Sequence, residues 1–249
     1  MTNFNTNEFI TSCVVWIRKW FETNGKDCNA VIGLSGGKDS TVAAALVAKA
    51  IGEHRVYGIS MPDHSKGQGD NEAKAIAEYL GIKYRIVPID SEEIIHHMLY
   101  SAIDASEQAV QNIPPRLRMT TLYALAQSLN GRVVGTRNAS ELYIGYATRY
   151  GDLASDFEPL SSLTCRQVVA VGKALGIPDM WIEKVPDDGL PNSEPDDEKF
   201  KRWGFSYALL DEYLEDGTSG DGTIDKIIEK KHESQLFKMG LGTMFDYKQ

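Results

Sequence analysis

The segment Gly33-Leu34-Ser35-Gly36-Gly37-Lys38-Asp39-Ser40 follows the apolar run Ala30-Val31-Ile32 and precedes a helix-forming run over residues 41–49. This order predicts a buried strand, a tight glycine-rich turn and a helix. Backbone N–H groups at such a turn, together with the helix N-terminus, form an anion-binding site. Adjacent glycines let the main chain approach an anion closely. The segment therefore predicts a phosphate-binding turn at the end of the strand.

The polar side chains of this turn indicate phosphate that is shared with a cation. Lys38 adds a positive charge, and Ser35 and Ser40 add hydroxyl donors. Asp39 repels phosphate, which makes sense if its carboxylate holds a divalent cation that the phosphates also bind. The segment is not a Walker A loop, because Asp39 follows Lys38 and Ile32 stands where the first glycine belongs. A glycine-rich turn without a ligand would need neither the lysine nor both serines.

The composition is that of a globular protein with an excess of acidic residues. The 249 residues are 42% hydrophobic and 24% charged, with a formal net charge of -9. This charge argues against a general nucleic-acid-binding surface, since phosphate backbones require a basic face. Three cysteines without a CxxC pair argue for a reducing compartment and against a zinc site or a disulfide framework. We find no signal peptide and no apolar stretch of membrane-spanning length, so we expect a cytoplasmic protein without membrane association.

Strand-like and helix-like segments alternate along the chain, the strands being residues 30–32, 56–61, 83–89 and 132–136. This alternation predicts an α/β fold with a doubly wound, mostly parallel sheet. In such sheets, ligands bind beyond the carboxyl ends of the strands. Both Gly33–Ser40 and the polar stretch Thr136–Glu141 follow strand ends, so we expect them to form one site. We expect a single domain over residues 1–249.

Three further segments carry specific expectations. Residues 146–163 are polar and broken by glycine, so we expect them to lie outside the core. Pro114 and Pro115 predict a break in the chain before a helix over 116–129. Residues 187–203 hold two prolines and many acidic residues, which predicts a mobile loop able to act as a lid.

The glycine-rich turn resembles the pyrophosphate-binding loop of the N-type ATP pyrophosphatases, Ser-Gly-Gly-x-Asp-Ser, whose members split ATP into AMP and pyrophosphate. Other stretches narrow the resemblance to the NAD synthetases. They are residues 112–119, 135–141, 145–152, 159–160, 196–198, 204–207 and 211–214. The resemblance covers nearly the whole chain in order. It implies the Rossmann-like adenine nucleotide α-hydrolase fold.

The resemblance also implies an activity. The chain looks like the ammonia-dependent form, because no segment corresponds to the glutaminase domain of the glutamine-dependent branch. The implied reaction converts deamido-NAD, ATP and ammonia into NAD, AMP and pyrophosphate through an acyl-adenylate. ATP is then the co-substrate and Mg²⁺ the cofactor. The family is homodimeric, with deamido-NAD bound near the dimer interface.

The same resemblance implies roles for individual residues. The expected catalytic residues are Lys38, Asp39 and Glu141, and the expected Mg²⁺ ligands are Asp39 and Glu141. The residues expected to contact ATP are Gly33, Leu34, Ser35, Gly36, Gly37, Lys38, Asp39, Ser40, Met61, Gln68, Thr136, Cys165 and Asp187. The residues expected to contact deamido-NAD are Arg116, Arg149, Asp156, His232 and Glu233.

Three positions depart from the family pattern, in which 165 and 233 are usually lysine and 187 is serine or threonine. This chain has Cys165, Asp187 and Glu233 there, which removes two positive charges and adds two negative ones around a polyanion. The cations that could compensate are Arg166, Lys184 and Lys238. Two alternatives therefore stay open. One is an enzyme of this class that amidates or thiolates another acceptor, with Cys165 as a nucleophile, and the other is a nucleotide-binding protein without turnover.

Overall fold

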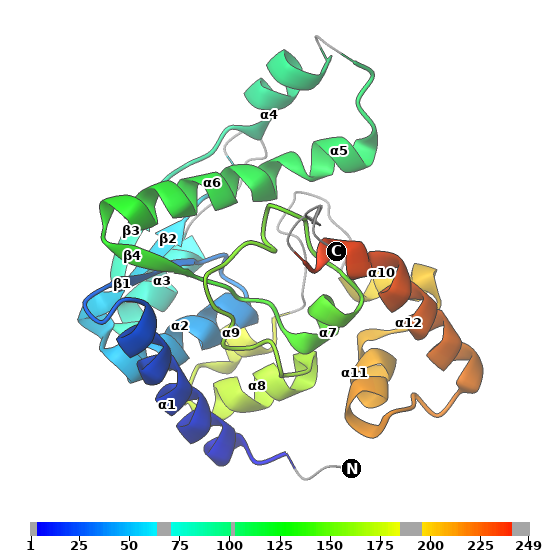
Figure 1. Cartoon of the computed structure of the whole chain (residues 1–249). Coiled ribbons are helices and arrows are strands. Elements are labelled where there is room, and N and C mark those ends of the chain that lie inside the picture. Colours follow the sequence, from blue (N-terminus) through cyan, green and yellow to red (C-terminus); the bar gives the residue numbers. More distant parts are fainter. Residues whose placement is uncertain (1–3, 64–70, 101–102, 185–195, 241–249) are drawn as a thin grey trace, which may run out of the picture.

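The computed structural model describes residues 4–63, 71–100, 103–184 and 196–240, and its centre is a four-stranded parallel sheet (Figure 1). The strands are β1 (Asn29–Gly33), β2 (Val56–Ser60), β3 (Lys83–Ile86) and β4 (Gly131–Val134). Their order in the sheet is β3-β2-β1-β4, and every pair is parallel. The predicted doubly wound α/β fold is confirmed.

The direction in which strands are added reverses at β1. Ile32 of β1 pairs with Gly58 of β2 on one side and with Val134 of β4 on the other. Strands β2 and β3 therefore extend the sheet one way, and β4 extends it the other way. Such a reversal is the switch point at which open α/β sheets bind ligands. The segments that follow β1 and β4 both leave the sheet there.

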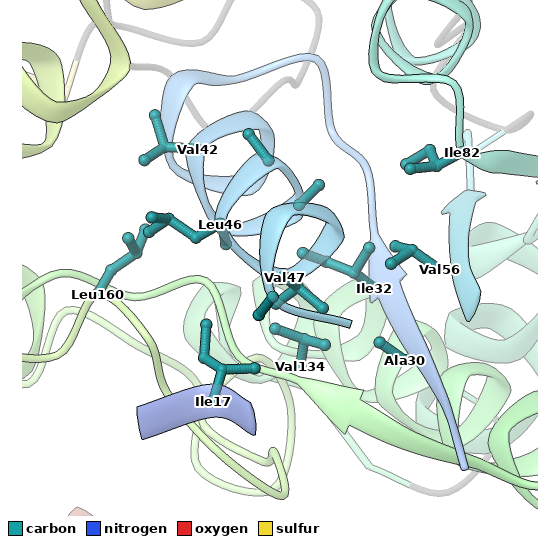
Figure 2. Packing of buried hydrophobic residues seen from close by; sticks show 14 of the residues in the cluster. Ile17, Ala30, Ile32, Val42, Leu46, Val47, Val56, Ile82, Val134 and Leu160 are labelled. Atoms are coloured by element: carbon teal, nitrogen blue, oxygen red, sulfur yellow. The ribbon is translucent and has the colours of Figure 1, made fainter. Parts of the chain in front are cut away.

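Helices cover both faces of the sheet. These are α1 (Thr6–Asn24), α2 (Lys38–Ile51), α3 (Asn71–Leu80) and α8 (Cys165–Ala174) on one face, and α6 (Ile113–Ser128) on the other (Figure 1). Alternate residues of a strand point to opposite faces. Ala30 and Ile32 accordingly join the cluster under α2, whereas Val31 joins the cluster under α6. Figure 2 shows Leu46 and Val47 of α2 within the first cluster.

A separate apolar cluster lies among the C-terminal helices α10 (Asp196–Trp203), α11 (Tyr207–Asp216) and α12 (Gly222–Gln235). Phe200 is fully buried at its centre, with its ring stacked on that of Tyr207 at a centroid distance of 4.2 Å. The remaining elements are short. They are the α-helices α4 (Ser91–Ile94), α5 (Glu107–Gln111), α7 (Ala139–Tyr143) and α9 (Asp179–Ile182), a π-helix over Ile95–Tyr100, and the 3-10 helices Glu53–Arg55 and Leu236–Lys238. Within the described ranges, no helix is long and apolar enough to cross a membrane.

The prediction that residues 146–163 lie outside the core is wrong. Phe157, Leu160 and Leu163 are all buried, and the ring of Phe157 lies 4.5 Å from that of Trp20 and 5.5 Å from that of Phe21. Phe157 forms only an isolated β-bridge with Val134, and Leu160 and Leu163 lie outside the helices and strands. Their burial therefore follows no period that sequence patterns could reveal.

Two other expectations need correction. Residues 196–203 form helix α10 instead of a loop, because Phe200 anchors them in the C-terminal cluster; residues 187–195 lie outside the described ranges. Pro114 and Pro115 do not break the chain, because they occupy the first turn of α6. Proline is tolerated in a first turn, since its missing N–H has no partner within the helix there.

A substitution at Gly58 can test how tightly β2 packs against its neighbours. A Cβ atom at this position would lie 2.4 Å from Cδ1 of Leu34 and 3.2 Å from Cδ1 of Ile82. We expect Gly58→Ala to lower the free energy of unfolding by about 1–3 kcal/mol, the usual cost of overpacking a core. Gly222→Ala is the matched control, because no atom lies within 4 Å of that Cβ position. Urea unfolding measures both variants, and equal stabilities would contradict this packing.

Candidate active site

The turn after β1 leaves the N-terminus of α2 open toward the switch point. Gly36 adopts a φ of 85°, and a Cβ atom there would lie 2.8 Å from Oε2 of Glu72, so the position requires glycine. Gly37 is the N-cap of α2 and provides no side-chain acceptor, whereas α7 and α8 both begin with capping boxes. The first N–H groups of α2 are therefore placed to bind an anion.

The two serines of the turn have different positions. Ser40 is buried, and its hydroxyl donates to the carbonyl oxygen of Gly37 at 3.1 Å. Ser35 is exposed, and its Oγ lies 3.3 Å from that of Ser40 and accepts the N–H of Gly37 at 3.2 Å. Ser40 thus holds the turn together, while Ser35 is accessible to a ligand.

Asn138 brings the two predicted metal ligands together across the switch point. Its Nδ2 donates to Oδ1 of Asp39 at 3.0 Å. Its Oδ1 accepts the backbone N–H of Glu141 at 3.0 Å, and Oε2 of Glu141 accepts the N–H of Asn138 at 3.3 Å. Asp39 and Glu141 follow different strands, and this single buried amide links them as the predicted site requires.

The ammonium group of Lys38 lies inside this arrangement. Lys38 is only 5% exposed, and its Nζ donates to Oδ2 of Asp39 at 2.8 Å. Burial alone would lower the pKa of Lys38, but the neighbouring charge of Asp39 outweighs burial and raises that pKa. Lys38 is therefore positively charged at neutral pH.

The carboxylates of Asp39 and Glu141 fit a divalent cation that is shared with phosphate. Burial, followed by the charge of Asp39, raises the pKa of Glu141, because little water reaches a second negative charge there. A cation at this position would remove that penalty. The described residues contain no group of three or more His, Cys, Asp or Glu side chains able to hold a metal. A carboxylate pair suits Mg²⁺, which keeps several waters and binds substrate phosphates.

Cys165 is the partly exposed first residue of α8 and lies near these charged groups. Its backbone N–H donates to Oγ of Ser140 at 3.1 Å and to Oδ1 of Asp211 at 3.3 Å. Burial raises the pKa of the Cys165 thiol to about 12, despite the opposing charge of Lys38. The thiolate is the nucleophilic form, so this environment argues against Cys165 as a nucleophile.

The three cations expected to compensate for Cys165, Asp187 and Glu233 each have a partner in the protein, and Glu72, the partner of Lys184, lies beside Gly36 of the turn. Nε of Arg166 lies 3.1 Å from Oε1 of Glu215, and Nζ of Lys184 lies 2.5 Å from Oε2 of Glu72. Lys238 donates to the carbonyl oxygen of Gly145 at 3.2 Å. The positive charge that acts most strongly on the Cys165 thiol belongs to Lys38, in the turn itself.

The structure brings together two of the residues expected to bind deamido-NAD. Arg116 is exposed, and its Nε donates to the carbonyl oxygen of Arg149 at 3.4 Å. The guanidinium carbon of Arg149 lies 5.0 Å from the ring centre of Tyr150 and 6.0 Å from that of Phe237. Arg116 is therefore accessible and contacts the backbone of Arg149.

The other expected deamido-NAD contacts are separately placed. Asp156 holds the edge of β4, because its Oδ2 accepts the N–H of Val133 at 2.7 Å. His232 stacks on Tyr143 with ring centres 4.0 Å apart, and its Nδ1 lies 2.6 Å from the carbonyl oxygen of Tyr143. Glu233 is exposed on the next position of α12.

The residues outside the turn that are expected to contact ATP also lie in different environments. Met61 is buried after β2, where its methyl group would lie 3.4 Å from a Cβ atom on Gly33. Thr136 is partly exposed after β4, on the side of the switch point. Gln68 and Asp187 lie outside the described ranges.

Three residues of the site were missed by sequence reasoning. Asn138 could have been found, because Asn138 and Glu141 form the Asn-x-x-Glu variant of a capping box. Asp211 is buried and accepts bonds from Ser140, Cys165 and Arg166, so it joins α7, α8 and α11. The hydroxyl of Tyr207 is buried without a hydrogen-bond partner among the described residues. Tyr207 and Asp211 lie in stretches that carry the family resemblance, 204–207 and 211–214, but the resemblance assigned no role to either residue.

Comparisons with known proteins agree on one family. Residues 9–248 match the model of a family described as NAD synthase. The chain is 36% identical over 225 residues to the NH(3)-dependent NAD(+) synthetase of Carboxydothermus hydrogenoformans, covering 87% of this chain and 90% of that protein. Among solved structures, the NMN synthetase of Francisella tularensis has a TM-score of 0.86 at 30% identity, covering 98% of this chain and 100% of that one. The NH3-dependent NAD synthetase of Campylobacter jejuni has a TM-score of 0.79 at 25% identity, with the same coverage.

The environment of Cys165 leads to a test of its chemistry. Because its pKa is raised, we expect Cys165 in the folded protein to react with iodoacetamide at pH 8 at least about tenfold more slowly than in the chain unfolded by guanidinium. Mass spectrometry of the alkylated peptide measures both rates. We also expect Cys165→Ala to retain ATP-dependent turnover. Loss of turnover with ATP binding preserved would instead assign chemistry to the thiol.

Proposed function

The chain belongs to the NAD synthase family, and we propose that it uses ATP to amidate deamido-NAD with ammonia. The observation that carries this proposal is the link through Asn138, which joins an anion-binding turn to two carboxylates at the switch point. This is the combination that the cleavage of ATP into AMP and pyrophosphate requires. The names of the curated relatives supply the acceptor and the nitrogen donor.

The chemistry explains why ATP is consumed. A carboxylate is a poor electrophile, so ammonia cannot displace its oxygen directly. An oxygen of the nicotinate carboxylate attacks the α-phosphorus of ATP, the bond to the bridging oxygen breaks, and pyrophosphate leaves. Ammonia then adds to the carbonyl carbon of the acyl-adenylate, loses a proton, and displaces AMP. The products are NAD, AMP and pyrophosphate.

The protein contributes mainly by positioning and charge. The N–H groups at the start of α2, with Ser35 and Lys38, bind the β- and γ-phosphates and stabilise the departing pyrophosphate. Asp39 and Glu141 hold Mg²⁺. When bound, this ion supplies positive charge to the phosphate oxygens. Thr136 and Met61, which follow β4 and β2, remain expected contacts of the nucleotide.

Arg116 and Arg149 remain the expected contacts of the acceptor, and Arg116 contacts the backbone of Arg149. Two guanidinium groups suit the pyrophosphate bridge of a dinucleotide. Asp156, His232 and Glu233 remain expected contacts, although Oδ2 of Asp156 accepts the N–H of Val133 and its Oδ1 accepts the hydroxyl of Tyr123. A homodimer with the acceptor near its interface and a single domain over residues 1–249 remain parts of this proposal.

A second acceptor has a specific observation in its favour. The structural neighbour with a TM-score of 0.86 is an NMN synthetase. We therefore keep nicotinate mononucleotide as the second candidate acceptor, amidated by the same two steps. It lacks the AMP half of deamido-NAD, so the two candidates differ only in the part of the acceptor that is distant from the reacting carboxylate.

One assay tests the function and separates the acceptors. Purified protein is mixed with ATP, Mg²⁺ and ammonium, and with either deamido-NAD or nicotinate mononucleotide. We expect AMP and NAD in equal amounts with deamido-NAD, and a lower kcat/KM with the mononucleotide. The reverse preference would make the protein an NMN-forming enzyme. AMP formation only with a different acceptor, or nucleotide binding without AMP, would exclude both candidates.

The carboxylates give a second test. Asp39→Asn and Glu141→Gln each remove one negative charge while keeping the side-chain shape, and the amide oxygen introduced by Glu141→Gln can still accept the N–H of Asn138. We expect each variant to lower AMP formation at least about 100-fold, because Mg²⁺ loses a carboxylate ligand. Glu183→Gln is the control, since Glu183 pairs with Lys173 on the exposed surface. Near-wild-type turnover in Asp39→Asn and Glu141→Gln would contradict the metal assignment.

A further inference from the structure

Both carboxylate oxygens of Asp39 are already engaged by the protein. Oδ1 accepts Nδ2 of Asn138 at 3.0 Å, and Oδ2 accepts Nζ of Lys38 at 2.8 Å. Lys38 is 5% exposed, so its ammonium has little access to water. A charged lysine is rarely buried to this degree unless it is paired. The pair with Asp39 is therefore a built feature of the turn.

The ion pair lies between two segments of the site. Lys38 and Asp39 begin α2 after β1, and Asn138 of the segment after β4 donates to the other carboxylate oxygen of Asp39. A divalent cation held by Asp39 and Glu141 would need the region that the ammonium occupies, because it would bind the same carboxylate of Asp39.

We propose that Lys38 is a resident counter-cation of this site, which a divalent cation must displace from Oδ2 of Asp39 in order to bind. The inference rests on the proposed function only in taking Asp39 as a metal ligand. Mg²⁺ binds carboxylate oxygens at about 2.1 Å, so the ion and the ammonium cannot both bind Oδ2 without strong repulsion. The long lysine side chain allows Nζ to leave Asp39 while the backbone of α2 stays in place.

The displacement couples metal binding to phosphate binding. An ammonium that leaves Asp39 inside a poorly hydrated site needs another anion, and phosphate at the adjacent helix N-terminus supplies one. Without phosphate, the lysine opposes the divalent cation. With phosphate, the lysine has a partner and the opposition disappears. The chain therefore favours the metal and the polyphosphate together over the metal alone.

Manganese binding to the nucleotide-free protein tests the inference, because Mn²⁺ resembles Mg²⁺ in its ligands and is counted directly by electron paramagnetic resonance. Lys38→Met removes the ammonium and keeps an apolar stem. We expect this variant to bind Mn²⁺ at least about tenfold more tightly than the wild type, because a neighbouring like charge is removed. Lys173→Met is the control, since Lys173 pairs with Glu183 at the surface, and its Mn²⁺ affinity should equal that of the wild type.

The second part of the experiment repeats the Mn²⁺ measurement with pyrophosphate present. We expect pyrophosphate to raise the Mn²⁺ affinity of the wild type by a larger factor than that of Lys38→Met. Equal Mn²⁺ affinities of wild type and Lys38→Met without pyrophosphate would overturn the inference. So would tighter binding that persists in the double variant Lys38→Met/Asp39→Asn. If Lys38→Met does not fold, Lys38→Gln makes the same comparison with a polar side chain.

These readouts are separate from the test of the proposed function. A wild-type protein that forms neither NAD nor nicotinamide mononucleotide would end the proposed function, whereas the Mn²⁺ comparison would still decide the role of Lys38. Conversely, if the enzyme is fully active but Lys38→Met does not change its Mn²⁺ affinity, the proposed function stands and the role of Lys38 as a counter-cation is rejected.

Discussion

The side-chain amide of Asn138 is the contact on which the geometry of the site depends. It donates to Asp39 of the turn after β1 and accepts from the backbone of Glu141 after β4. Two carboxylates repel each other, and burial makes that repulsion stronger. Asn138 holds both without adding a charge, because its side chain donates to the Asp39 carboxylate and its backbone N–H donates to the Glu141 carboxylate. The strand order makes this possible, because only at the switch point do the ends of β1 and β4 lie next to each other.

The carboxylate of Asp211 connects this site to the C-terminal helices. Asp211 of α11 binds Ser140 of α7 and the backbone N–H groups of Cys165 and Arg166 at the start of α8. An acidic side chain is favourable at a helix N-terminus, so the contact holds α8 in place while orienting α7. The pKa of Cys165 is raised in this setting, and the thiol is a packed neighbour of the site. This environment argues against sulfur transfer by Cys165.

The sequence reveals the parts of this protein that are local and periodic. The strand, turn and helix around Gly36 follow from adjacent residues, and the meeting of Asp39 with the Asn138–Glu141 segment follows from parallel strands that share one edge. The core role of Phe157 could not be predicted, because irregular chain has no hydrophobic period. The hydrogen bond between Asp156 and β4 and the direction of the Lys38 side chain could not be predicted either. A lysine beside an aspartate can face water, and only the fold shows that Lys38 is buried against Asp39.

The parallel arrangement also has a consequence for how the chain reaches this state. Strand β1 can pair with β2 soon after synthesis, but its other edge waits for β4, about a hundred positions later. Until then the apolar edge of β1 and the charged turn have no neighbour on that side. Pairings so distant along the chain form slowly and leave strand edges open to other molecules. The binding site is thus assembled among the last parts of the molecule, and a chain released before β4 would carry the phosphate turn without its carboxylate partner.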